Sequence, residues 1–111
     1  MEGRAVSAAR GAARERQVLE LLRAEWWLAM RAPASRGFCD IIALRAMPPV
    51  YHGSDVRLIE VKSTQRNPWN DFGPAARQAL SAAARQAGAS AWVAWWPLHG
   101  KLQWIPESEW P

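Results

Sequence analysis

The stretch VRLIEVKS at residues 56–63 decides the fold, because it has the pattern of a strand with one chemically unusual end. Successive side chains of a strand point to opposite faces, so Glu60 and Lys62 share a face with Leu58. A surface ion pair would explain a Glu-x-Lys pattern, but such a pair stabilises little. The carboxylate and the ammonium at the end of an apolar face therefore favour a functional role.

Working outward, the preceding apolar stretch predicts a second strand over residues 38–45, with Asp40 near its start. The short connection to residues 56–63 favours an antiparallel hairpin, in which the start of one strand lies beside the end of the other. Asp40 is then close to Glu60 and Lys62. Carboxylate oxygens suit Mg²⁺ or Mn²⁺, so two carboxylates with a lysine beside them predict a divalent-metal site.

A third carboxylate lies on a predicted helix over residues 6–26. The apolar stripe of this helix is interrupted only by Glu15, whereas Glu20 and Glu25 lie on other faces. A carboxylate on a buried stripe is costly unless it is paired or binds a metal. Glu15 is therefore a candidate ligand for the same ion. The apolar positions of the stripe are Ala8, Ala12, Leu19, Leu22 and Trp26.

The remaining pattern completes an α/β order of αβββαββ. Pro74 suits the first turn of a helix and Gly88 suits its C-terminal end, which bounds a helix over residues 74–87. The expected strands are residues 28–32, 38–45, 56–63, 90–96 and 101–105. The length of 111 residues allows a single domain, residues 1–111.

The composition indicates which classes of binding partner the protein has. The net charge of +4 and the pI of about 10.2 favour a polyanion such as nucleic acid, although an arginine-biased surface would give the same balance. The longest apolar run, Ala91 to Trp96, is too short to span a membrane. The single cysteine excludes an internal disulfide, and we expect Cys39 to be a small buried thiol.

The site pattern resembles the PD-(D/E)XK nucleases, with an acid on the first helix, an acid at a strand start and Glu-x-Lys on the next strand. More narrowly, it resembles the archaeal-type Holliday junction resolvases, which also occur in phages. Cys39 stands where the superfamily usually has proline. The matching pieces are residues 13–16 (ARER), Arg31, residues 35–37 (SRG), residues 40–43 (DIIA), residues 60–63 (EVKS), the alanine-rich second helix and residues 88–89 (GA).

This resemblance implies a restriction-endonuclease-like domain, with a mixed central sheet flanked by helices. It implies a cytoplasmic homodimer (in the host cytoplasm if phage-encoded) that cuts four-way DNA with Mg²⁺, or also Mn²⁺, and needs no organic cofactor and no membrane. The roles it implies are metal binding by Glu15, Asp40, Glu60 and the Val61 carbonyl, orientation of water by Lys62, and phosphate contacts by Arg16, Arg31, Arg36 and Ser35.

Two alternatives remain open at this point. One is a single-domain repair or flap nuclease of the VRR-NUC kind, and the other is a non-catalytic basic DNA-binding module. The strand over residues 90–96 is apolar on both faces, which suits a central strand or a subunit contact around Trp95 or Trp96. The alanine-rich second helix would permit close approach of the sheet or of a second subunit.

Overall fold

The computed structural model describes residues 2–32, 39–46 and 54–111. Five strands and two α-helices follow one another in the predicted order, with two short 3₁₀ turns added. The elements are α1 (Glu2–Ala24), β1 (Leu28–Arg31), β2 (Ile41–Ala46), β3 (Ser54–Ser63), η1 (Trp69–Asp71), α2 (Pro74–Ala87), β4 (Ser90–Trp96), β5 (Gln103–Pro106) and η2 (Glu107–Glu109).

The strands form one mixed sheet in the order β1-β2-β3-β4-β5. Among the strands of the described ranges, only β3 and β4 run parallel to each other, and α2 makes the crossover between them. The expected β2–β3 hairpin is antiparallel, with Ile41 opposite Ile59. Helix α2 has the predicted bounds, and Gly88 ends it with φ of 65°, a backbone conformation that favours glycine. The predicted α/β class and mixed sheet are confirmed.

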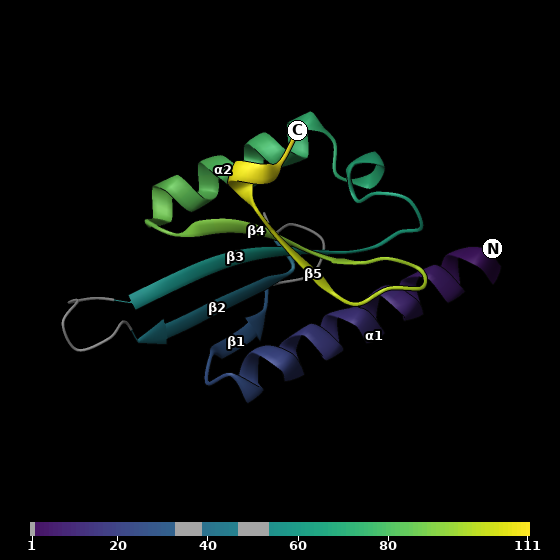
Figure 1. The fold of residues 1–111 in the computed structure, drawn as a ribbon, viewed down its shortest axis with the longest axis horizontal. Coiled ribbons are helices and arrows are strands. Elements are labelled where there is room, and N and C mark those ends of the chain that lie inside the picture. The colour runs from purple at the N-terminus through teal and green to yellow at the C-terminus, as the bar shows by residue number, and fades with distance from the viewer. Residues whose placement is uncertain (1, 33–38, 47–53) are drawn as a thin grey trace.

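The two helices cover opposite faces of the sheet, α1 on one side and α2 on the other (Figure 1). Neighbouring residues of β3 therefore enter different cores, with Ile59 facing α1 and Leu58 facing α2. The core under α1 consists of Val18, Leu19, Leu22, Trp27, Ala29, Ile41, Ala43, Ile59 and Ala94. The core under α2 consists of Cys39, Leu58, Phe72, Leu80, Ala84, Ala91 and Val93.

The predicted apolar stripe of the first helix is wrong at its end. Helix α1 stops at Ala24, and Trp26 adopts φ of 68° with 89% of its surface exposed. This left-handed residue turns the chain, so that Trp27 enters the core in its place. Leu19 and Leu22 are buried as expected, whereas the side chain of Ala8 lies outside the described residues.

The fourth strand has a neighbouring strand on each side in the sheet. Strand β4 pairs with β3 and β5, and its tryptophans pack inside the chain. Trp96 packs against the core under α1 and Trp95 against the core under α2. Both tryptophans are partly buried against these cores, and the placement of Trp95 or Trp96 at a dimer contact stays a prediction.

Arginine and tryptophan alternate in a stack on the α1 side of the sheet. The Arg57 guanidinium lies 4.7 Å from the centre of the Trp27 ring and 4.3 Å from that of Trp92. Arg45 lies 4.2 Å from the Trp27 ring centre. These contacts hold two cations over indole faces, where the ring quadrupole attracts them.

Among the described residues, no helix has the length and apolar composition needed to cross a bilayer.

Two neighbouring leucines of α1 test which face of this helix points toward the core. Leu22 is 2% exposed and Leu21 is 45% exposed. Leu22→Ala should lower the free energy of unfolding by about 2–5 kcal/mol, because it leaves a cavity in the core. Leu21→Ala should cost less than about 1 kcal/mol. Urea denaturation measures both, and equal losses would contradict this orientation of α1.

Candidate active site

The site begins where the pairing of β2 with β3 ends. Continuing the Ile41–Ile59 register places Asp40 beside Glu60. The Asp40 backbone is held on both sides, since its N–H donates to the Ile59 carbonyl and its carbonyl accepts from the Ala32 N–H, each at 2.9 Å. Asp40 thus lies just before β2, not within the strand as expected.

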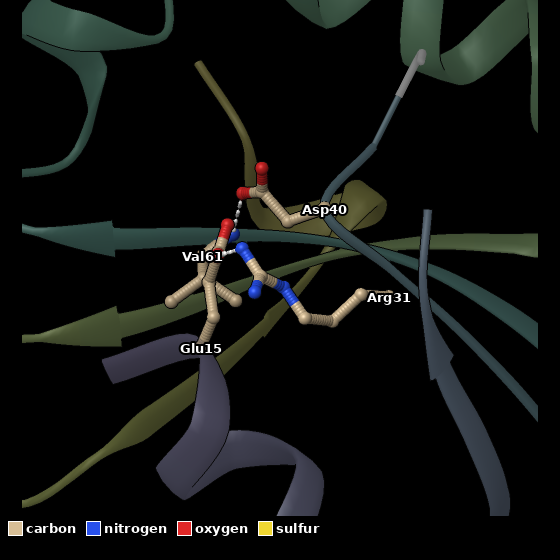
Figure 2. Close-up of polar contacts among 4 residues, drawn as sticks. All are labelled: Glu15, Arg31, Asp40 and Val61. Atoms are coloured by element: carbon tan, nitrogen blue, oxygen red, sulfur yellow. Dashed lines mark hydrogen bonds and ion pairs between the residues drawn. The ribbon is translucent and has the colours of Figure 1, made fainter. Parts of the chain in front are cut away.

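Strand β2 begins at Ile41, and the side chain of Asp40 supplies the next hydrogen-bond acceptor for β3 beyond that strand. Oδ2 of Asp40 accepts a hydrogen bond from the Val61 N–H at 2.7 Å (Figure 2). Val61 lies between Glu60 and Lys62, so one hydrogen bond ties Asp40 to the middle of the Glu-x-Lys motif. A buried N–H that would lack a strand partner is satisfied by a charged acceptor, which makes the bond strong.

Glu15 reaches the same place from α1. Arg31 of β1 donates from Nη2 to Glu15 Oε2 at 2.7 Å, and Figure 2 shows this pair beside Asp40 and Val61. Burial raises the pKa of Glu15, and the negative charge of Asp40 raises it further, while Arg31 opposes the shift. The Glu15 carboxylate is therefore both desolvated and close to a like charge.

Glu60 approaches Asp40 along β3. Lys62 Nζ lies 3.5 Å from Glu60 Oε1, and the two side chains are 21% and 18% exposed, respectively. Burial raises the pKa of Glu60 to about 7, with the Asp40 charge as the second cause and Lys62 acting against it. Two glutamates thus interact unfavourably with one aspartate, which is the electrostatic condition that a bound cation relieves.

The carboxylates converge without forming a closed cage. Within residues 2–32, 39–46 and 54–111, no three His, Cys, Asp or Glu side chains are gathered tightly enough to surround an ion. The negative charge of Asp40 nevertheless raises the pKa of both Glu15 and Glu60. Carboxylates repel one another, and Arg31 and Lys62 pair with Glu15 and Glu60. The donor set of hard oxygens fits Mg²⁺.

The other predicted residues have different surroundings. Arg16 is exposed on α1, and Arg31 contacts a carboxylate in addition to facing solvent. Val61 contributes its N–H to the contact described above. The predicted phosphate contacts Ser35 and Arg36 lie outside the described residues.

Cys39 is the buried thiol expected from the sequence. It packs in the core under α2, where burial raises its pKa to about 11 and keeps it protonated at neutral pH. Ile42 packs against the same core, so strict alternation does not extend back through Asp40.

Sequence reasoning missed the contact between Trp95 and the segment after β3. The Trp95 indole N–H points at the carbonyl and hydroxyl oxygens of Thr64, at 3.2 and 3.0 Å. Thr64 in turn donates its hydroxyl to the Asn67 carbonyl at 2.7 Å. The backbone directly after Lys62 is therefore fixed. The pairing of Thr64 with Trp95 leaves no periodic signal, since the two are far apart in the sequence.

Comparison with known proteins identifies the family of this chain. The family model for the archaeal Holliday junction resolvases (Hjc) matches residues 6–109. The chain belongs to this family. It is therefore a junction-resolving nuclease, and its restriction-endonuclease-like fold agrees with that membership.

A solved relative supports the same assignment. The chain is similar to Archaeoglobus fulgidus Hjc, a Holliday junction resolvase from an archaeal hyperthermophile whose structure was determined at 1.6 Å resolution. The two share 26% identity and a TM-score of 0.68, over 89% of this chain and 74% of that one. A search of curated proteins found no match.

The raised pKa of Glu60 predicts how stability depends on pH in metal-free buffer. The carboxyl is protonated more readily in the folded chain, at about 7 instead of 4.5. Its contribution to the free energy of unfolding is therefore present at low pH and lost as pH rises from 4.5 to about 7. Glu60→Gln should reduce this loss, and Glu15, whose pKa also rises, should retain part of it.

Denaturation at about pH 5 and about pH 8 measures the effect. Glu20→Gln, an exposed change on α1, is the control and should keep the wild-type pH dependence. An unchanged pH dependence in Glu60→Gln would contradict the assigned burial of this carboxyl.

Proposed function

We propose that this chain resolves four-way DNA junctions by Mg²⁺-dependent hydrolysis of one phosphodiester bond in each of two opposed strands. The proposal is supported by the position of Asp40, which is held by the Val61 N–H beside Glu60, with Lys62 3.5 Å from Glu60 and Glu15 paired with Arg31 nearby. Family membership supports the substrate class. Because the substrate is DNA, we expect the protein to act in the cytoplasm, or in that of a host.

The three carboxylates would hold the metal, with the Val61 carbonyl as a further ligand. Bound by these residues, Mg²⁺ would polarise the scissile phosphate and lower the pKa of the attacking water. Lys62, held near Glu60 at 3.5 Å, is positioned to orient that water and to stabilise negative charge that develops on the phosphate. The Val61 N–H keeps the Asp40 carboxylate in a single orientation throughout.

The arginines would hold the DNA. Arg16 is exposed next to Glu15, and Arg31 is 48% exposed although one of its nitrogens pairs with Glu15. A guanidinium has five N–H donors, so Arg31 can contact a carboxylate and a phosphate together. Arg36 and Ser35 are proposed for the same purpose on the sequence pattern alone.

Cleavage of synthetic substrates tests the function. The protein should nick a four-way junction in paired, symmetric positions with Mg²⁺, cut duplex, flap and single-stranded DNA far less, and do neither in EDTA. Asp40→Ala and Glu15→Gln should lose cleavage by orders of magnitude and still bind the junction, because binding depends on the arginines. Glu20→Gln should cut normally.

Other outcomes would support the alternatives. Preferential cleavage of flaps would favour a repair nuclease of the VRR-NUC kind. Binding without cleavage in any metal would favour a non-catalytic module. Activity that survives Asp40→Ala would contradict the assigned site.

The proposed assembly is a homodimer, because paired cuts need two sites and each chain carries one. The outer face of α2 is the proposed contact, since small side chains there allow close approach. This exposed stripe consists of Ala75, Ala79 and Ala82. Trp95 and Trp96 are already partly buried against the two cores, so the exposed face of α2 is the preferred contact.

Light scattering should give a dimer at micromolar concentration. Ala82→Glu should weaken the dimer and convert paired cuts into single nicks, because it places a charge in the contact. Ala24→Glu, the same change at an exposed alanine at the end of α1, is the control and should leave the dimer intact. A monomeric wild type that still makes paired cuts would contradict the dimer.

A further inference from the structure

A small pocket lies beside the site and has no role in the cleavage scheme above. It has a volume of about 100 Å³, roughly that of three water molecules. It opens between α1 and the ends of β3 and β4. Its walls are Arg14, Ser63, Thr64, Gln65 and Leu98.

The cation of this pocket is held in one orientation. The Arg14 guanidinium lies 4.6 Å from the centre of the Trp96 ring, and its Nη1 donates to Gln17 Oε1 at 2.9 Å. None of the ion pairs found within the described ranges involves Arg14. Its positive charge is therefore not neutralised by a described carboxylate, and the remaining N–H donors are available to a ligand.

The opposite wall is also fixed. Thr64 is bound by the Trp95 indole N–H and by the Asn67 carbonyl, so its own hydroxyl is already used. Ser63 and Gln65 on either side of Thr64 are exposed, and their hydroxyl and amide groups are the polar donors left on this wall. Leu98 adds an apolar surface at the rim.

The pocket continues the line of the site along β3. Ser63 follows Val61 by two residues, so both lie on the α1 face of the strand, whereas Lys62 between them points to the other face. Arg14 directly precedes Glu15 on α1. The pocket residues Arg14 and Ser63 are therefore the chain neighbours of Glu15 and Lys62, so one DNA strand can contact both the pocket and the site.

We propose that this pocket binds the DNA phosphate next to the one that is cut, with Arg14 as the charged donor and Ser63 and Gln65 as neutral donors. The proposal rests on the proposed function, because the order of the phosphates is set by the position of the cut. Held at two successive phosphates, the strand is fixed in direction as well as in place. Arg14 and Ser63 are then positioning residues for the cleavage.

Arg14→Gln tests the charge. In the full chain, with Ca²⁺ in place of Mg²⁺ to prevent cutting, it should weaken junction binding roughly tenfold. The slope of log affinity against log salt should fall by about one phosphate contact. Arg85→Gln removes the same charge from the exposed end of α2 and should change neither quantity to this extent. Equal effects of the two changes would overturn the proposal.

A second variant leaves the Arg14–Trp96 stack intact. Ser63→Asp places a negative charge in the pocket and should also weaken binding, whereas Ser108→Asp, the same change at an exposed serine of η2, should not. Thermal unfolding of each variant separates misfolding from lost contacts. If Arg14→Gln unfolds, Ser63→Asp decides, and its equality with Ser108→Asp would overturn the proposal.

The outcomes also separate the two proposals. If the wild type cuts junctions and both pocket variants bind like their controls, the proposed phosphate pocket is wrong and the proposed function is supported. If the wild type cuts no junction while Arg14→Gln and Ser63→Asp still weaken DNA binding, the proposed function fails and the phosphate pocket stands.

Discussion

The site depends on the hydrogen bond from the Val61 N–H to the Asp40 carboxylate. Strand β3 extends beyond the start of β2, and the carboxylate takes the acceptor position that a further residue of β2 would have filled. A side chain that completes a backbone ladder cannot move without breaking the ladder. The charge of Asp40 raises the pKa of both Glu15 from α1 and Glu60 from β3, so the chemistry of the site depends on the end of a strand.

The elements that could be predicted are those whose cause is local. Pro74 and Gly88 bound α2 because one fits the first turn and the other adopts a left-handed backbone at its end. The hairpin between β2 and β3 followed from the short connection, and the isolated position of Glu15 on the apolar stripe led to the third carboxylate. In each case the physical cause lies within a few residues of its effect.

What could not be predicted depends on contacts between distant residues. The periodicity of α1 placed Trp26 in the core, but a single left-handed residue turned it out and Trp27 in. Arg31 was assigned to phosphate alone, because nothing near it in sequence marks Glu15 as its partner. Alternation assigned Cys39 to the face opposite to Ile42, but the irregular backbone before Ile41 brings both residues against the core under α2.

The single parallel pair of strands also has a consequence for how the chain folds. The site residues all precede Ser63, and the strands that carry them pair in chain order through antiparallel neighbours. The parallel pairing of β3 with β4 must wait for the α2 crossover, which closes a longer loop. We therefore expect the carboxylates to come together when only part of the sheet has formed. At that stage the face of the sheet that carries Leu58 and Cys39 is still exposed to solvent. The second half of the chain then packs over this face and removes water from the carboxylates.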